Sequence, residues 1–351
     1  MSSDKSDLQK LKPVIYGCQG LSLTETEKEF FKKAKPFGFI LFKRNCQSRQ
    51  QIINLIEEFK NISEQDNPAI LIDQEGGRVC RLKAPTWQEH YSPGKLIDLL
   101  ENKNDFSLIE QAIKLNNQLI AYDLNELGIN VNCTPVADLL IDGADNIIGD
   151  RSFGQDPDIV ARLAQLVCDA MLDNNIMPII KHIPGHGRAK VDSHLSLPII
   201  DNKLDELYNS DFAVFRQLKS APWAMTAHII FSTLDPNNPV TTSKIAIKYI
   251  REEIGYEGLI LTDDLSMQAL TGDFGTRATA SLEAGCNLLL HCNGNMAEMV
   301  QINDVIEFIS NETIEKIINA KKQLKDANKL DYNVTQQKLS QLIASHKVNC
   351  A

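Results

Sequence analysis

Short apolar runs alternate with longer amphipathic stretches along most of the 351-residue chain. Eight of these runs have the length and composition of buried strands, and helical periodicity dominates between them. The eight runs span residues 14–17, 38–42, 69–73, 129–133, 176–181, 223–227, 258–262 and 287–291. Eight strands that alternate with helices predict an α/β fold. They favour a closed parallel (β/α)8 barrel of the TIM type over an open doubly wound sheet.

Local signals mark the ends of two predicted helices. Thr24 and Glu27 have the spacing of a capping box, and Gly128 is typical of a helix end. Helices are expected over residues 24–35, 52–59, 106–127, 158–172 and 243–254. No linker or repeat interrupts the pattern, and residues 303–345 have helical periodicity. We therefore expect one domain over residues 1–351, with outer C-terminal helices at about 303–345.

The composition excludes several classes of protein. A formal net charge of −10 argues against a nucleic-acid-binding protein and against a basic protein of membrane surfaces. The eight cysteines include no Cys-x-x-Cys pair, so neither a zinc ribbon nor a redox motif is indicated. The first residues form no apolar signal region, and no apolar run is long enough to span a membrane. We expect a cytoplasmic protein without nucleic-acid or membrane partners, and a monomer is favoured.

Polar side chains stand at the ends of several predicted strands. In a parallel barrel the carboxyl ends of the strands meet on one face, where enzymes of this architecture have their active sites. Each residue also fits an ordinary structural role, such as a turn, a helix cap or a core histidine. Their shared position at strand ends is what indicates a site. The residues are Asp73, Lys181, His182, His228, Asp263 and His291.

The stretch 179–194, IIKHIPGHGRAKVDSH, carries the densest group of titratable residues. His182 and His186 have the spacing of a helical metal pair, but Pro184 between them disfavours a helix. The Gly-His-Gly turn lacks the Lys-Ser/Thr pair of a phosphate loop. Asp192 and His194 project to the same side of an extended segment, where the carboxylate would favour a protonated imidazole that acts as a proton donor. A surface loop whose Asp and His cap backbone amides fits the same pair equally well.

Five motifs in order resemble glycoside hydrolase family 3. They are LIDQEGGRVCRL at 71–82, GDRSFG at 149–154, KHIPGHG followed by DSH at 181–194, MTAHII at 225–230 and LTDDLSM at 261–267. The chain is most similar to the single-domain bacterial β-N-acetylglucosaminidases of peptidoglycan recycling. The resemblance implies a small-molecule substrate, the muropeptide fragment GlcNAc-1,6-anhydroMurNAc. We expect no metal or other cofactor, because neither a metal-ligand spacing nor a phosphate loop is found in the sequence.

The resemblance also implies residue roles. Asp263 would be the nucleophile of a retaining double displacement, and His194 the general acid and base, with Asp192 as its orienting partner. The residues expected to bind the sugar and its N-acetyl group are Asp73, Arg81, Arg151, Lys181 and His182. Glu75, Arg78 and His228 lie in matching motifs without an assigned contact. Asn287 and the stretch 239–243 depart from the family pattern, and both are expected to lie away from the catalytic groups.

Other functions remain open on the sequence alone. A β-glucosidase of the same family would take its acid from a further domain, which this pattern lacks. A phosphorylase is compatible with a histidine acid, because a neutral imidazole avoids a second negative charge beside phosphate. A hexosaminidase directed at chitooligosaccharides fits the same motifs. A non-catalytic sugar-binding barrel is the poorest fit, since the expected catalytic residues are all present.

Overall fold

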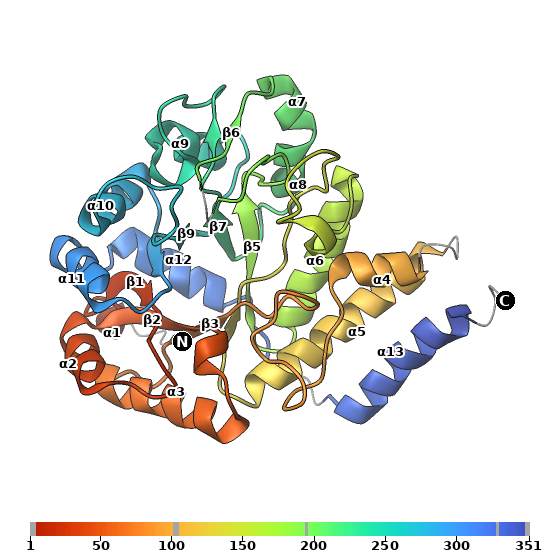
Figure 1. The fold of residues 1–351 in the computed structure, drawn as a ribbon, viewed down its shortest axis with the longest axis horizontal. Helices are drawn as coiled ribbons and strands as arrows, with labels where there is room; N and C mark the ends of the chain where they lie inside the picture. The colour runs from red at the N-terminus through yellow and green to blue at the C-terminus, as the bar shows by residue number, and fades with distance from the viewer. Residues whose placement is uncertain (1–4, 101–104, 194–195, 328–329, 348–351) are drawn as a thin grey trace.

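A computed structural model describes residues 5–100, 105–193, 196–327 and 330–347. Eight parallel strands close into a barrel in the order β1, β10, β9, β7, β5, β4, β3, β2 (Figure 1). The strands are β1 (Lys12–Tyr16), β2 (Pro36–Leu41), β3 (Ala69–Ile72), β4 (Val131–Asn132), β5 (Met177–Ile183), β7 (Trp223–Thr226), β9 (Leu259–Asp264) and β10 (Leu288–His291). The predicted (β/α)8 barrel is confirmed, because each of the eight predicted runs overlaps one of these strands.

The strand ends differ from the predicted ones in two places that bear on the site. β5 continues through His182 to Ile183, and β9 continues through Asp263 to Asp264, so these side chains belong to strands rather than to loops. β4 is shorter than predicted. It pairs with β5 through Val131–Met177 and Asn132–Pro178, and beyond it the hydrogen bonds to β5 continue irregularly, from the Ile179 N–H to the Thr134 carbonyl and from the Lys181 N–H to the Pro135 carbonyl.

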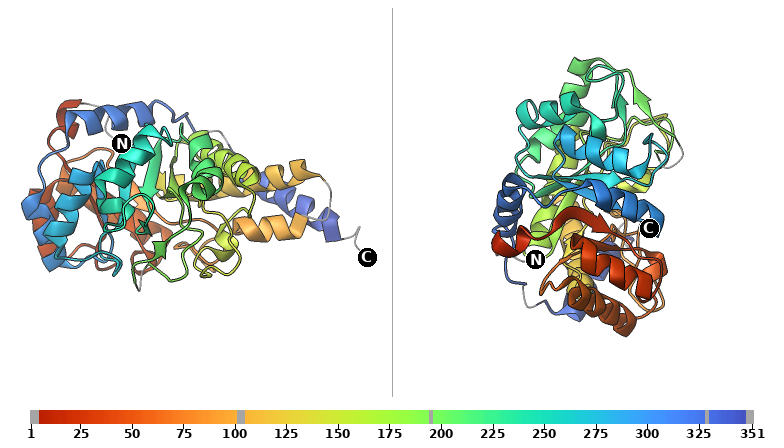
Figure 2. Two further views of the ribbon diagram at one scale, coloured as in Figure 1. Left: turned by 90° about the horizontal axis from the view of Figure 1, so that it is seen from above. Right: turned by 90° about the vertical axis from the view of Figure 1, so that its left-hand side faces the viewer.

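Helices surround the barrel. They include α2 (Glu25–Ala34), α3 (Arg49–Ser63), α5 (Phe106–Asn125), α6 (Pro157–Leu172), α9 (Lys244–Glu252), α10 (Phe274–Ala284), α11 (Met296–Val305), α12 (Asn311–Lys321) and α13 (Tyr332–Lys347). The capping box of Thr24 and Glu27 is present at the start of α2. Figure 2 shows α13 alongside α5 and α4 (Pro93–Leu100) at one end of the molecule, on the outside of the barrel.

Between β5 and β7 the chain forms structure that the sequence pattern did not predict. A short strand, β6 (Ile199–Ile200), belongs to a small parallel sheet. Two short helices follow it, α7 (Leu204–Asn209) and α8 (Asp211–Gln217). β6 pairs with β8 (Ile230–Phe231), which follows β7. The small sheet thus joins the loop after β5 to the loop after β7 (Figure 1).

Both faces of the barrel strands are buried, which explains why the strands appear in the sequence as unbroken apolar runs. Residues that alternate with one another along each strand belong to two separate clusters. One cluster fills the barrel interior and includes Ile15, Leu71, Ile179, Leu261 and Leu290. The other packs between strands and helices and includes Val14, Ile70, Ile180, Ile260 and Leu289. No helix among the described residues is long and apolar enough to cross a membrane.

Candidate active site

A cavity of about 330 Å³ opens at the carboxyl ends of the barrel strands. Ionisable side chains dominate its lining, with a few apolar ones among them. The polar lining residues are Asp73, Glu75, Arg78, Arg81, Arg151, Lys181, His182, His186, Asp192, Ser193, Asp263 and Asp264. The apolar ones include Phe42, Ile147, Ile148, Met225 and Met267. One cavity is therefore lined by all five predicted sugar-binding residues and by Asp192 and Asp263. His194 lies outside the described residues.

Strand alternation places the charged residues over the barrel axis. Successive side chains of a strand point to opposite faces, so a residue two positions after an inward one also points inward. Leu71, Ile179 and Leu261 belong to the interior cluster. Asp73, Lys181 and Asp263 each follow by two positions, and all three line the cavity.

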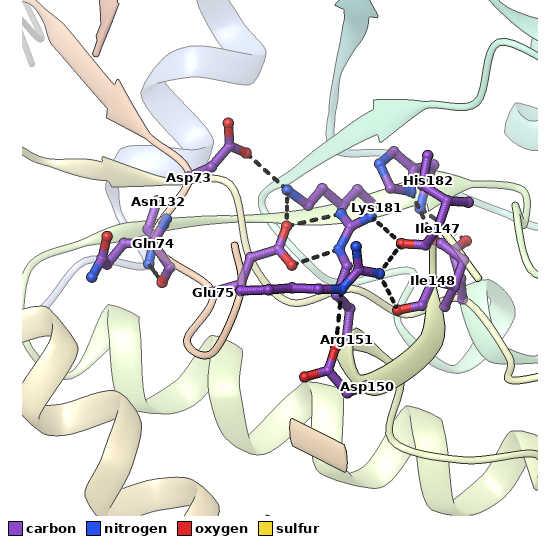
Figure 3. A network of polar contacts seen from close by, with 12 residues as sticks. Asp73, Gln74, Glu75, Asn132, Ile147, Ile148, Asp150, Arg151, Lys181 and His182 are labelled. Atoms are coloured by element: carbon purple, nitrogen blue, oxygen red, sulfur yellow. Dashed lines mark hydrogen bonds and ion pairs between the residues drawn. The ribbon is translucent and has the colours of Figure 1, made fainter. Parts of the chain in front are cut away.

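One ammonium group contacts two carboxylates that line the cavity (Figure 3). Lys181 Nζ lies 2.9 Å from Asp73 Oδ1 and 2.6 Å from Glu75 Oε1. Burial alone would raise the pKa of Asp73, but Lys181 and Arg81 lower it well below its usual range. The two carboxylates in turn raise the pKa of the buried Lys181. All these groups are charged at neutral pH, and the carboxylates can only accept hydrogen bonds from a ligand.

Glu75 is bound from its other side by a guanidinium. Arg151 donates to it from Nε at 2.8 Å and from Nη2 at 2.9 Å, and also donates to the carbonyl of Ile147 (Figure 3). Burial opposes ionisation of Glu75, but Arg151 and Lys181 lower its pKa to about 2. Glu75 is therefore ionised and paired, which makes it a poor acid at neutral pH.

The two remaining arginines border the cavity. Arg81 donates to Asp73 at 2.9 Å, and its guanidinium lies 4.8 Å from the centre of the Phe42 ring. Arg78, for which the sequence suggested no contact, donates to Asp150 and to the carbonyls of residues 146–148. It therefore connects the loop after β3 to the loop that carries Arg151.

A buried carboxylate orients His182. Asp138 Oδ2 lies 2.7 Å from His182 Nδ1, so this ring nitrogen carries the proton. Asp138 Oδ1 accepts from the backbone N–H groups of His182 and His186, at 3.1 Å and 2.7 Å. His182 lines the cavity, and its Nε2 is left as the ring atom that can act on a ligand.

The second Asp of the TDD motif has a structural role. The Asp264 carboxylate accepts from the Ser266 hydroxyl at 2.6 Å and from the backbone N–H groups of Ser266 and Cys292. The backbone N–H of Asp264 donates to Asp263 Oδ1 at 2.8 Å. Asp264 therefore holds the chain after β9 in place, and Asp263 lies beside it on the same cavity.

Two strand-end histidines do not reach the cavity, contrary to the sequence-based grouping. His291 follows the inward Leu290 by one position and therefore points outward, where Nε2 lies 2.8 Å from Glu298. His228 is fully buried between Thr241 Oγ1 and the carbonyl of Asp264, and burial lowers its pKa. It is a satisfied core histidine that supports the chain beside Asp263.

The position of the divergent stretch 239–243 also needs correction. Thr241 in this stretch bonds to both His228 and Thr226, and Thr226 accepts from the backbone N–H of Asp263. The stretch is therefore next to the strand that carries Asp263 rather than remote from it. Asn287, in contrast, is hydrogen-bonded to the backbone of Ile260, near the start of β9, and to the side chains of Arg251 and Thr313. It does not line the cavity.

The family model for the glycosyl hydrolase family 3 N-terminal domain matches residues 7–326. The chain belongs to glycoside hydrolase family 3. A β-hexosaminidase of Neisseria gonorrhoeae is 36% identical over 289 residues, covering 80% of this chain and 78% of the relative. One of Aromatoleum aromaticum is 34% identical over 293 residues, covering 82% and 80%. The crystal structure of NagZ from Neisseria gonorrhoeae with N-trifluoroacetyl-D-glucosamine is similar too. Its TM-score is 0.80 at 30% identity, covering 95% of this chain and 97% of that one.

Sequence reasoning missed three residues of this family 3 glycoside hydrolase: Asp138 as the anchor of His182, and His186 with Ser193 as neighbours in the cavity. Asp138 lies six positions after the end of β4 at Asn132, too far along the loop for the strand-end pattern to single it out. No group of three or more His, Cys, Asp or Glu side chains among the described residues is arranged to hold a metal ion.

Proposed function

We propose that this family 3 glycoside hydrolase is a retaining β-N-acetylglucosaminidase, that is, a β-N-acetylhexosaminidase that removes terminal GlcNAc from muropeptide fragments. Its expected substrate is GlcNAc-1,6-anhydroMurNAc. The observation that supports it most is the meeting of Asp263 and Asp192 on one cavity with a charged, sugar-sized set of donors and acceptors. Two comparisons support the same substrate class. The curated relatives are named as β-hexosaminidases, and the similar crystal structure contains a glucosamine derivative.

In the proposed mechanism Asp263 attacks the anomeric carbon and forms a covalent glycosyl-enzyme. His194 protonates the departing oxygen, with Asp192 favouring the imidazolium form. His194 then takes a proton from water, which displaces Asp263 and restores the β configuration. Asp73 and Lys181 complement each other in this scheme, since a sugar hydroxyl can donate to the carboxylate and accept from the ammonium.

The substrate test is a product analysis with three substrates. GlcNAc-1,6-anhydroMurNAc, chitobiose and a nitrophenyl β-glucoside are compared by kcat/KM. We expect the muropeptide fragment to be the best substrate and the glucoside to be nearly inert. The first product should be β-GlcNAc when the reaction is followed by proton NMR before mutarotation. A first-formed α-anomer would exclude double displacement, and preference for chitobiose would make the protein a chitooligosaccharide enzyme.

Phosphate provides a second arm of the same experiment. Addition of inorganic phosphate should leave the rate unchanged and yield free GlcNAc. Accumulation of the sugar 1-phosphate would identify a phosphorylase, and the absence of any turnover on all three substrates would identify a non-catalytic sugar-binding barrel.

A further inference from the structure

His186 occupies the centre of the Gly-His-Gly turn after β5, and it has no role in the mechanism above. It is buried, with 2% of its surface exposed, and it lines the cavity. Its Nε2 is hydrogen-bonded to Ser193 Oγ at 3.1 Å. Ser193 is also buried, and it directly precedes His194 in the sequence.

The turn that carries His186 is held firmly against the barrel. Asp138 Oδ1 accepts from the His186 backbone N–H at 2.7 Å, and the same carboxylate binds His182. Gly187 lies so close to the chain that an added Cβ would be 2.2 Å from the carbonyl oxygen of Leu139. Gly185, at φ +146°, has a conformation that favours glycine. His186 is therefore a fixed point from which a neighbouring segment can be held.

We infer that the hydrogen bond between His186 and Ser193 holds Ser193 at the cavity and thereby positions the proposed acid that follows it in the sequence, with Asp138 as the common anchor of that bond and of His182, a proposed sugar-binding residue. Ser193 and His194 are consecutive, so their Cα atoms are about 3.8 Å apart and fixing one limits the reach of the other. His186 and Ser193 are positioning residues, and the inference rests on the proposed role of His194.

The ionisation of His186 agrees with a positioning role. Burial, together with the nearby His182, lowers its pKa to about 4. The imidazole is therefore neutral at neutral pH and carries one ring proton, and it is not available as an acid for the substrate. Within the described part of the chain Nδ1 has no hydrogen-bond partner, so the bond with Ser193 is the one hydrogen bond of the ring, whose centre lies 5.3 Å from that of the His182 ring.

Ser193→Ala tests the inference, because it removes only the hydroxyl. The readout is kcat/KM for two substrates, the natural disaccharide with its poor sugar leaving group and a dinitrophenyl glycoside that needs no acid. A misplaced acid should lower kcat/KM for the disaccharide roughly 10-fold, the worth of one hydrogen bond, and leave the dinitrophenyl glycoside within about 2-fold. Ser193→Thr keeps the hydroxyl and should keep most of the activity.

A double-mutant cycle identifies the partner. His186→Gln fills much of the ring's space but cannot reproduce its geometry toward Ser193. If the two side chains act through their mutual bond, His186→Gln, Ser193→Ala and the double variant should show similar losses on the disaccharide. The exposed Ser196→Ala, three positions along the same loop, is the control and should be close to wild type.

Five outcomes are distinguished, with His194→Ala measured in parallel. Selective loss in Ser193→Ala with non-additive coupling to His186 supports the inference. Additive losses, equal loss on both substrates, or unchanged activity in Ser193→Ala would overturn it while leaving the proposed function intact, provided that His194→Ala shows selective loss. If His194→Ala itself shows no selectivity between the substrates, the proposed acid is wrong and the inference is overturned with it.

Discussion

Asp263 and Asp264 are adjacent carboxylates that both line the cavity, and we propose different roles for them. Asp264 accepts three hydrogen bonds from Ser266 and Cys292, which hold the chain after β9, and Asp263 accepts from the backbone N–H of Asp264. Asp263→Asn removes the nucleophilic charge with little change in volume. Turnover should fall at least roughly 1,000-fold while binding of GlcNAc, measured by calorimetry, stays nearly unchanged. A loss of only a few-fold in a folded protein would mean that another carboxylate attacks.

The proposed role of His194 has two parts that one variant separates. His194→Ala should lose far more activity on the natural disaccharide than on a nitrophenyl glycoside, because only the sugar leaving group needs a proton. Azide needs no general base, so it should restore turnover of the nitrophenyl substrate and give the β-glycosyl azide. Asp192→Ala should behave in the same way but less severely, since it only orients and charges the imidazole. Failure of azide to accelerate the variant would place the acid elsewhere.

Glu75 connects the site to the stability of the protein. Its pKa is about 2 in the folded state against an ordinary value of 4.5, so the deprotonated form of Glu75 favours the folded state over the unfolded state. The resulting stability is fully present above about pH 4.5 and is lost as the pH falls toward 2. Denaturant unfolding at pH 7, 5 and 3 should show this loss, and Glu75→Gln should reduce the pH dependence by on the order of 2–3 kcal/mol. An unchanged slope in the variant would show that Glu75 does not carry it.

At the scale of elements, the loops after β3 and β4 form one wall of the cavity because Arg78 connects them. Its guanidinium donates to Asp150 and to three consecutive carbonyls, a set that a lysine cannot reproduce. Arg78→Ala should raise KM roughly 5- to 20-fold through displacement of Arg151, with a smaller effect on kcat. The exposed pair of Arg162 with Glu110 gives a matched control, Arg162→Ala, which should leave both constants unchanged. Equal KM values in the two variants would contradict the role of Arg78.

The strands and helices differ in how well the sequence pattern predicts them. The eight strands were predictable because strands buried on both faces are apolar throughout, and period-two alternation then accounts for Asp73, Lys181 and Asp263. The same alternation excludes His291, and applying it at the sequence level would have prevented that error. The short α7, α8 and β6–β8 elements have too few residues for a periodic signal. The roles of Asp138 and Ser193 depend on contacts with His182 and His186 that only the folded chain brings about.

At the scale of the whole molecule, every step of the proposed chemistry is assigned to side chains of this chain. We expect activity without any added metal ion or nucleotide. Treatment with a chelator followed by desalting should leave kcat/KM within about 2-fold of the untreated enzyme, because carboxylates and imidazoles supply acid, base and nucleophile. Complete inactivation that a divalent ion reverses would contradict this expectation.

The small β6–β8 sheet gives the loop after β5 a second attachment. Ser193 is bound to His186 on one side, and Ile199 pairs with Ile230 on the other, with five residues between Ser193 and Ile199. A side chain on so short a segment has a high effective concentration at any point that the segment can reach. This concentration falls as the segment is lengthened. Under the proposed mechanism, the length of this loop, as much as the identity of its histidine, would set how often a proton is delivered to the glycosidic oxygen.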